Sequence, residues 1–548
     1  ANADSVQTTH YYYNRPGMVD SIITPGGRSP TKVARKQGFL RDPGGNPYIT
    51  YPGNGNMVYH GYDWAERQNY VELPATDVHR SLDGETFAPD TTISKYIEGY
   101  LVNGTYLHGG QYNQYTYDGK GQLETGQAID AWRNDTIATT YRTYSPAGLL
   151  VRESQTYSGK LVVDRTYQYD RRGQRLVDAD TVYGKNGGSV SSESAGTIKY
   201  VYDSLTGRLK SDTALVDSAG TVFPWAVTSY VYDHAGRDSV RTLRLGAASG
   251  LGTSLTTLTL YDGTTGRTSL LQTTSPAGSY QFSAPTYDAA GRLTGFSGTE
   301  PHIGSVTESY VYDPAGTGRL LETHRNFGSF SRSTAYSYDV YGNRLTDLSS
   351  STVSGENVGC NGDVGQSTFG GDSRLLRKYT AGCGSVVTFY QDQTGNRLME
   401  LDSTVNSPNE AYSGYRQTYT AGNQLYYSLN ATSVAGTYDA NWHLYDYAGR
   451  RVQTLYQQSF GNWFRTPNFA SGNITYYIYD GDEVALTALK TGTTGFLLRQ
   501  RYLSEGTDGA IAARVRNSAN GAQETLGLLT DYQGTTLESI KLDGTEET

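Results

Sequence analysis

The chain has 548 residues and a formal net charge of −9 at pH 7, and its composition is unusual for a globular protein. It contains 48 Tyr and 65 Gly residues, while 18% of its residues are charged and 36% are hydrophobic, against about 25% and 45–50% in typical domains. The many aromatic residues argue against a disordered chain. The lack of an apolar run of about 18 residues argues against a membrane-spanning helix, and the acidic balance disfavours a nucleic-acid-binding protein.

The N-terminal part of the chain, residues 1–110, contains weak copies of a phrase that recurs throughout the sequence. The full phrase is an aromatic residue, any residue, Tyr, Asp, a short spacer, Gly, Arg and Leu. Partial copies occur at Tyr13 with Gly17, and at Tyr62 and Asp63 with Arg67. An internal repeat decides the fold of the whole chain, so we predict degenerate repeats over residues 1–110.

Clear copies of the phrase fill residues 111–480. Between Asp170 and Asp339 the repeated Asp residues follow one another at steps of 33, 30, 29, 26, 25 and 26 residues. This regular spacing predicts one continuous array of similar units. The repeat positions that we single out are Tyr117, Asp118, Tyr169, Asp170, Tyr202, Asp203, Gly207, Arg208, Tyr232, Asp233, Gly236, Arg237, Tyr287, Asp288, Gly291, Arg292, Tyr312, Asp313, Tyr338, Asp339, Gly342, Tyr445, Asp446 and Gly449.

One repeat has the pattern of a β-hairpin. Tyr200 and Tyr202 recur with the period of two that a half-buried strand needs. Asp203 begins a turn, where its carboxylate can accept a backbone N–H two residues on, and Gly207 supplies the positive φ of a tight turn. The Tyr side chains can stack across strands, and Arg208 can lie on a neighbouring ring or pair with the turn Asp.

Stacked hairpins predict the architecture. A single two-stranded hairpin is marginally stable, whereas hairpins stacked edge to edge pair every exposed strand edge with the next unit. We therefore predict an all-β fold of serial antiparallel hairpins in one long curled sheet, essentially without long helices. Residues 481–548 are expected to add degenerate C-terminal repeats.

The Tyr-Asp phrase with its following Gly-Arg-Leu resembles the YD repeat of the rearrangement-hotspot (RHS) family, which also occurs in shell components of Tc toxin complexes and in teneurins. The resemblance covers most of the chain and implies a hollow β-shell that, in bacterial members, encloses a C-terminal toxin. Residues 529–535, Leu-Thr-Asp-Tyr-Gln-Gly-Thr, resemble the opening of the core region that ends such shells, with Thr in place of Ser. The Asp-Pro-x-Gly-x-x-Asp-Gly phrase of that core does not follow, so we expect the self-cleaving protease and the toxin outside these residues.

The resemblance implies a non-catalytic shell or scaffold segment of an exported toxin protein, secreted or at a bacterial cell surface. Its partners would be an enclosed toxin domain or further copies of the chain. The alternative is an extracellular structural or adhesive protein that forms a layer, rod or filament by edge-to-edge assembly. In that case the Tyr array could also bind a cell-surface glycan by stacking. Neither interpretation involves nucleic acid or a membrane span.

The sequence contains no motif that predicts catalysis or a cofactor. His-Glu-x-x-His, Cys-x-x-Cys, Gly-x-x-x-x-Gly-Lys-Ser/Thr and Gly-x-Ser-x-Gly are all absent. Asp178-Ala-Asp180 lacks the Gly and Glu of a calcium loop. We therefore predict that the chain is not an enzyme and binds no cofactor or metal. Cys360 and Cys383, the two cysteines, fit either one disulfide in an exported protein or two separate thiols.

Overall fold

The computed structural model describes residues 9–24, 35–51, 57–63, 65–72, 91–97, 100–106, 111–130, 135–183, 195–218, 220–314, 316–339, 342–351, 364–369, 375–380, 385–391, 397–402, 415–419, 424–431, 437–460, 472–490, 496–504, 510–516, 523–531, 533 and 535–542. Cys360 and Cys383 lie outside these ranges, so a disulfide between them stays a prediction. The division into residues 1–110, 111–480 and 481–548 also stays a prediction.

The described residues form forty β-strands and contain no helix, so none of them could cross a membrane as a helix. The first strands are β1 (His10–Tyr13), β2 (Val19–Thr24), β3 (Arg35–Arg41), β4 (Pro47–Tyr51), β5 (Val58–Tyr62), β6 (Gln68–Glu72), β7 (Thr91–Ile97), β8 (Tyr100–Tyr106), β9 (Gln111–Tyr117), β10 (Leu123–Asp130), β11 (Asp135–Tyr144), β12 (Leu150–Tyr157) and β13 (Lys160–Tyr169). They are followed by β14 (Arg175–Val182), β15 (Ala195–Tyr202), β16 (Leu209–Ser218), β17 (Thr221–Tyr232), β18 (Asp238–Ala247), β19 (Gly250–Tyr261), β20 (Thr268–Thr274), β21 (Ser279–Tyr287), β22 (Leu293–Glu300), β23 (Gly304–Tyr312), β24 (Leu320–Phe327), β25 (Phe330–Tyr338) and β26 (Arg344–Ser351). The last are β27 (Val364–Phe369), β28 (Leu375–Thr380), β29 (Ser385–Gln391), β30 (Arg397–Asp402), β31 (Tyr415–Tyr419), β32 (Leu425–Ala431), β33 (Thr437–Tyr445), β34 (Arg451–Phe460), β35 (Asn473–Asp480), β36 (Glu483–Lys490), β37 (Phe496–Ser504), β38 (Ala510–Arg516), β39 (Gln523–Thr530) and β40 (Thr536–Lys541).

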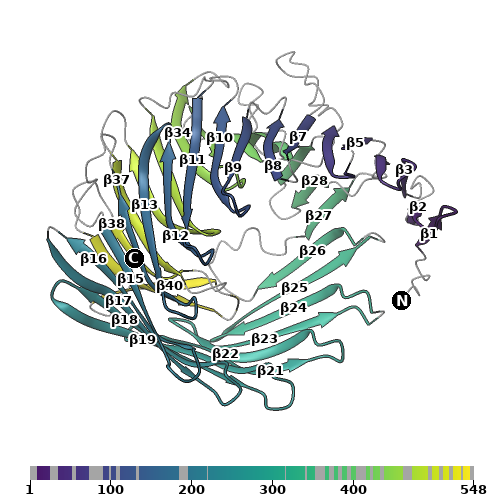
Figure 1. Cartoon of the computed structure of the whole chain (residues 1–548). Coiled ribbons are helices and arrows are strands. Elements are labelled where there is room, and N and C mark those ends of the chain that lie inside the picture. The colour runs from purple at the N-terminus through teal and green to yellow at the C-terminus, as the bar shows by residue number, and fades with distance from the viewer. Residues whose placement is uncertain are drawn as a thin grey trace.

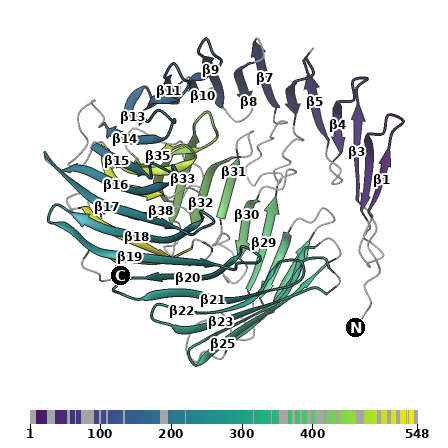
Figure 2. The ribbon, with the colours of Figure 1, turned by 60° about the horizontal axis from the view of Figure 1, so that its bottom comes forward.

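All forty strands belong to one antiparallel sheet. Each strand pairs with the next along the chain, from β1 with β2 to β39 with β40. Figures 1 and 2 show this sheet as an open curl. The predicted fold class, an all-β curled sheet of serial antiparallel hairpins, is confirmed.

The curl has a local cause that the sequence pattern did not predict. The strand register shifts next to the Tyr that precedes the turn Asp, for example between Val231 and Tyr232, between Val311 and Tyr312, and between Ser337 and Tyr338. Such an irregularity inserts an extra residue on one strand and increases the local twist. Its recurrence in repeat after repeat bends the sheet in a consistent direction.

The late strands lie inside the early ones. Strand β33 packs against β11, and β39 packs against β18. In Figure 1 the green and yellow strands line the concave side of the blue strands, and Figure 2 agrees. We call β9–β22 the outer layer, β32–β40 the inner layer, and the interface between them the seam.

The hydrophobic core lies in the seam, as two sheets packed face to face would require. One apolar cluster joins strands β10–β14 to β32–β37, a second joins β16–β19 to β37, β38 and β40, and a smaller third joins β21 and β22 to β39. The first cluster brings together residues about three hundred positions apart in sequence, for example Ala128 and Ala440. The seam therefore holds the C-terminal strands of the sheet against strands β10–β22.

One repeat position distinguishes the two layers. The residue between the two Tyr of the phrase points away from the concave side of the sheet. In the outer layer this residue faces solvent, so that Val201 and Val231 are 51% and 58% exposed. In the inner layer the same position faces the outer layer: Ile478 is 0% exposed, and Leu444, in a copy with His443 in place of the first Tyr, is 8% exposed.

Candidate functional site: the repeat turns and the seam

In the repeat turns the backbone N–H of the phrase Gly donates to the carbonyl of the phrase Asp, and the Asp carboxylate accepts backbone N–H groups of its own turn. At Asp233 the Oδ1 atom accepts the backbone N–H of Arg237 at 2.9 Å, and the backbone N–H of Gly236 donates to the carbonyl of Asp233 at 2.9 Å. These bonds stabilise the ionised carboxylate, and the pKa of Asp233 is lowered mainly by the bond from the Arg237 backbone. The turn glycines Gly207, Gly236, Gly291, Gly342 and Gly449 have φ between 72° and 88°.

In many repeats the Tyr before the turn Asp forms a hydrogen bond to the preceding repeat. The hydroxyl of Tyr232 donates to the carbonyl of Leu209 at 2.7 Å, and that of Tyr338 donates to Leu320 at 2.7 Å. The corresponding bonds elsewhere are Tyr169 to Leu150, Tyr312 to Leu293 and Tyr445 to Leu425. A buried Tyr hydroxyl needs such a partner, so the ring fills the sheet face while its tip bonds the neighbouring repeat.

The Arg of the phrase contacts the following repeat, whereas the Tyr hydroxyl bonds to the preceding one. Arg292 forms an ion pair with its own turn Asp288 at 2.6 Å, and its guanidinium lies 4.4 Å from the ring centroid of Tyr312 in the next repeat. Arg208 lies over Tyr232, Arg267 over Tyr287, Arg319 over Tyr338 and Arg450 over Tyr479 in the same manner. The Tyr rings of these repeats are therefore covered by guanidinium groups of the preceding repeat.

Replacing Gly291 by Ala is expected to destabilise the folded chain by about 1–2 kcal/mol, because a left-handed residue other than Gly costs that much. The φ of Gly291 is +83°, and a Cβ there would lie 2.5 Å from Nη2 of Arg267. Gly263 is the matched control, because a Cβ there would meet nothing within 4 Å. Urea unfolding of Gly291→Ala and Gly263→Ala would measure the difference, and equal midpoints would contradict the assigned turn geometry.

The seam is polar where inner-layer turns meet the outer layer. The carbonyl of Tyr447 accepts hydrogen bonds from Nδ2 of Asn113 at 3.4 Å and from the hydroxyl of Tyr115 at 3.2 Å. Its ring packs where a Cβ on Gly126 would stand, only 2.5 Å from that position. The Arg142 guanidinium lies 6.0 Å from the ring centroid. Glycine at position 126 therefore lets the inner turn approach the outer sheet.

The next inner-layer turn is held in a similar way. The carbonyl of Tyr479 accepts from Nη1 of Arg165 and from Nε2 of Gln155, the latter at 3.3 Å. Asp480 of the same turn accepts from Arg175 at 3.5 Å and from the hydroxyl of Tyr167 at 3.4 Å. Outer-layer side chains therefore bind inner-layer turns through both their main chain and their carboxylates.

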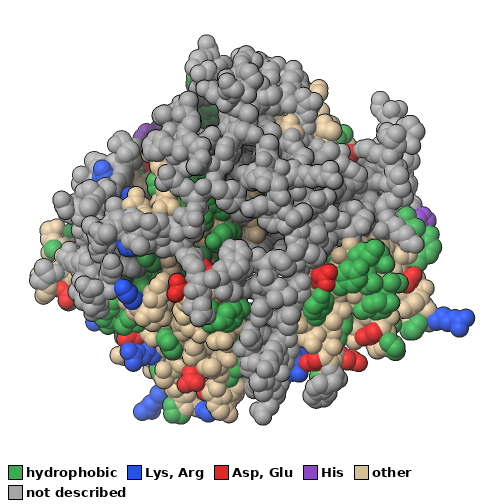
Figure 3. All heavy atoms as spheres, turned by 90° about the horizontal axis from the view of Figure 1, so that it is seen from above, with side chains coloured by type: hydrophobic (Ala, Val, Ile, Leu, Met, Phe, Trp, Pro, Cys, Tyr) green, Lys and Arg blue, Asp and Glu red, His purple; other side chains and the backbone are tan. Residues whose placement is uncertain are grey.

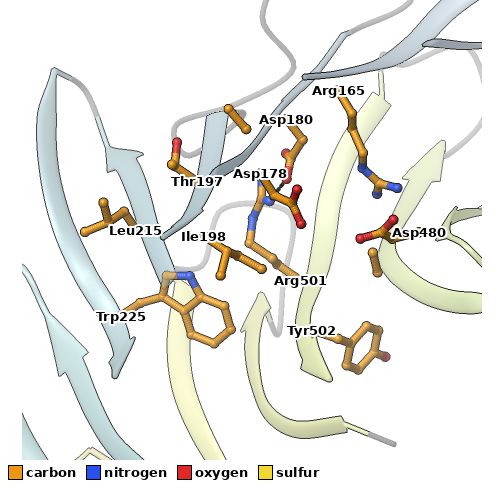
Figure 4. Close-up of a pocket in the computed structure, with 12 residues that line it drawn as sticks. Arg165, Asp178, Asp180, Thr197, Ile198, Leu215, Trp225, Asp480, Arg501 and Tyr502 are labelled. Carbon is orange, nitrogen blue, oxygen red and sulfur yellow. Dashed lines mark hydrogen bonds and ion pairs between the residues drawn. The ribbon is translucent and has the colours of Figure 1, made fainter. Parts of the chain in front are cut away.

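A small polar cavity lies in the seam beside this turn (Figure 4). Its volume is about 40 Å³. Its lining residues come from both layers: Arg165, Asp178, Ala179, Asp180, Thr197, Ile198, Leu215 and Trp225 from the outer layer, and Asp480, Ala485, Arg501 and Tyr502 from the inner layer. Figure 4 shows Arg501 extending from the inner layer toward Asp180 on β14.

The cavity contains one direct ion pair across the seam and one carboxyl with a shifted pKa. Nη1 of Arg501 lies 2.6 Å from Oδ2 of Asp180. Asp178 accepts from Arg175 at 2.9 Å and from the hydroxyl of Tyr200 at 3.1 Å. Burial nevertheless raises the pKa of Asp178 to about 6, because desolvation of the carboxylate outweighs the attraction of Arg175.

The sequence did not identify the seam residues. Arg165, Asp178 and Arg501 occupy positions outside the repeated phrase, and Asp178-Ala-Asp180 attracted notice only as an incomplete calcium loop. A signal was present in the strand itself, because two acidic residues two positions apart lie on the same face of a strand. Among the described residues no group of three or more His, Cys, Asp and Glu is placed to hold a metal ion.

His443 is a second buried titratable group, on inner-layer strand β33. Its Nδ1 lies 3.1 Å from Oγ1 of Thr454, and burial, with a smaller contribution from Arg451, lowers its pKa to about 4. Between pH 6.5 and about 4 the unfolded chain therefore takes up a proton that the folded chain does not, and stability falls as the pH decreases across this window.

We expect His443→Asn to lose less stability than the unchanged chain between about pH 7.5 and pH 5, because Asn keeps a hydrogen-bonding side chain and cannot be protonated. Urea midpoints of both proteins at the two pH values would measure the effect. His234, which is solvent-exposed on a repeat turn, is the control position. Equal losses for His443→Asn and the unchanged chain would show that His443 is not the acid-sensitive group.

No protein-family model matches the chain, and no curated protein gives a significant match. Among solved structures, TcdB2-TccC3 aligns with a TM-score of 0.35 and 12% identity over 98% of this chain and 34% of that chain. The TcdB2-TccC3-Cdc42 structure gives a TM-score of 0.35 and 13% identity over 98% and 34%. The Tc holotoxin pore of Photorhabdus luminescens gives a TM-score of 0.33 and 12% identity over 93% and 30%. The chain spans about a third of the length of these structures, and the similarity is too low to assign a function.

Proposed function

We propose that the chain is a non-catalytic structural segment that forms the wall of a shell or scaffold. The observation that carries the proposal is the use of the repeat residues. The Tyr hydroxyls and Arg guanidiniums bond neighbouring repeats and the Asp carboxylates hold the turns, so the polar groups of the repeated phrase build the sheet itself. A wall assembled in this way can be extended repeat by repeat without a separate core for each unit.

The geometry of the seam supports a structural role as well. The polar cavity, with about 40 Å³, is too small for a sugar ring or a peptide. Its charged groups bind turns of the same chain. On the face seen in Figure 3, hydrophobic, basic and acidic side chains of the described residues are interspersed. We propose that the concave side of the curl encloses or presents a cargo that lies outside these residues, in an exported protein of RHS type.

A second candidate is a surface layer or filament built by edge-to-edge assembly. Strand β1 pairs with β2, and among the described residues no other strand pairs with it. Its residues Tyr11, Tyr12 and Tyr13 are exposed. An exposed edge strand rich in Tyr is a template for pairing with another chain, which favours assembly between copies.

Light scattering during size-exclusion chromatography, combined with electron microscopy of the purified chain, would distinguish the two candidates. A discrete particle with a curled wall around an interior supports the shell. End-to-end or sheet-like assemblies that grow with concentration would overturn it in favour of the filament. Tyr12→Lys in β1 is the companion variant, because an edge Lys opposes strand pairing, and it should dissolve such assemblies while leaving a discrete shell unchanged.

A further inference from the structure

The seam has two apolar blocks with the polar cavity between them. The first block joins β10–β14 to β32–β37, and the second joins β16–β19 to β37, β38 and β40. The cavity is lined from β13 to β17 on one side and from β35 to β37 on the other, so it lies where one block ends and the next begins. In Figure 4 Arg501, Asp178 and Asp180 lie close together among the lining residues.

Six buried polar atoms at the cavity have no hydrogen-bond partner in the described part of the chain. Four are donors: Nη2 of Arg165, Nε and Nη2 of Arg501, and Nε1 of Trp225. Two are acceptors: Oδ1 of Asp178 and Oδ1 of Asp180. Arg165, Asp178 and Arg501 are only 5%, 8% and 6% exposed. Because buried polar groups are almost always satisfied in native proteins, these six atoms indicate a bound partner.

The Arg501 guanidinium is fixed in position for such a partner. Its Nη1 pairs with Asp180 at 2.6 Å. It lies against the backbone at Gly196, where an added Cβ would be 2.1 Å from Nη1, so a larger residue would displace it. The Nε and Nη2 atoms form the opposite edge of the planar group, and neither atom has a hydrogen-bond partner among the described residues.

The chemistry of the six atoms defines the ligand. It must accept hydrogen bonds from Arg165, Arg501 and Trp225 and also donate to Asp178 and Asp180. A halide ion can accept but cannot donate, and anions in general are disfavoured because the lining residues carry three carboxylates against two guanidiniums when ionised. A neutral molecule that both donates and accepts fits, and at roughly 10–15 Å³ for each water, a cavity of about 40 Å³ has room for about three.

We propose that the cavity is a hydration site for a cluster of about three ordered waters, which connect the two arginines and Trp225 to Asp178 and Asp180. The cluster makes the cavity a hydrated contact between the layers, which we call the joint, and it lies between the two apolar blocks of the seam. At this joint the layers are connected through water, the Arg501–Asp180 ion pair and the bonds of outer-layer side chains to the turn at Asp480. On either side of it lie the apolar clusters. The inference concerns the wall itself and holds whether or not the chain encloses a cargo.

A structure of the full chain at a resolution that shows ordered water would test the proposal directly, with one set of crystals soaked in sodium bromide. We expect water peaks within hydrogen-bond distance of the unpartnered atoms and no anomalous bromide peak in the cavity. A cavity without density would overturn the proposal, and so would a bromide ion in place of water.

A variant provides an independent solution test. Ala485 lines the cavity from β36, and Ala485→Val adds two methyl groups to it. Filling a dry cavity raises the melting temperature, whereas filling a hydrated one expels waters and leaves the polar atoms unsatisfied. We expect a lower melting temperature and fewer long-lived buried waters, counted by oxygen-17 magnetic relaxation dispersion. An unchanged water count in Ala485→Val would overturn the proposal. Leu205→Val, at an exposed turn, is the control and should change neither quantity.

Discussion

Replacing Ile478 by Ala is expected to destabilise the folded chain by about 2–5 kcal/mol, the cost of removing a large buried aliphatic side chain. Ile478 stands between the two Tyr of its repeat, on the inner layer, and is 0% exposed within the first apolar block of the seam. The vacated space would face packed outer-layer residues that cannot close over it.

Val231→Ala is the matched control, because Val231 occupies the same repeat position in the outer layer and is 58% exposed. We expect its effect to stay within about 0.5 kcal/mol. Urea unfolding followed by circular dichroism would measure both variants. Equal losses of unfolding free energy in Ile478→Ala and Val231→Ala would show that the inner layer is not packed against the outer layer as described. Such a result would not contradict the hairpin array itself.

Replacing Arg501 by Leu is expected to lower the free energy of unfolding by about 3–5 kcal/mol, similar to the loss for Ile478→Ala. The reason is that the substitution leaves the partly buried carboxylate of Asp180 without its cation. Arg501 and Asp180 pair at 2.6 Å across the seam, with side-chain exposures of 8% and 17%. The Arg501 guanidinium also packs against Gly196 of the outer layer, where a side chain would leave no room for it, so the substitution removes this contact as well.

The double variant Arg501→Leu/Asp180→Leu separates pairing from packing. A buried ion pair exchanged for apolar residues of similar size is often neutral in stability. We therefore expect the double variant to recover much of the stability lost in Arg501→Leu, in a double-mutant cycle of unfolding free energies. A double variant whose loss equals the sum of the single losses would show that the two residues do not act as a pair.

The sequence was sufficient to predict the hairpins because their determinants are local. The alternation of Tyr200 and Tyr202, the turn-forming Asp203 and the positive φ of Gly207 all act within one repeat. The contact of each Arg with a ring and with its turn Asp was also foreseeable, since both partners recur at a fixed spacing.

The nesting of the two layers could not be predicted in the same way. Val231 and Ile478 are similar residues at the same repeat position, and nothing nearby in sequence distinguishes an exposed one from a buried one. Whether the residue at this position is buried depends on the curvature accumulated over more than twenty strands, because that curvature brings β33 back to β11. The seam contacts therefore join residues such as Asp180 and Arg501 that no periodic pattern relates.

Each strand of the sheet pairs with its neighbours along the chain. Under mechanical load we therefore expect the strands to separate one after another, with added resistance where the two layers are packed together. Tension applied at a chain end would open the hydrogen bonds of one strand at a time, and each step would meet a small resistance. Where β33–β40 lie on β11–β19, peeling a strand would also require separating the layers, so the resistance would rise there. The toughness of this wall under load therefore depends on how far the curl overlaps itself, and less on how many repeats it contains.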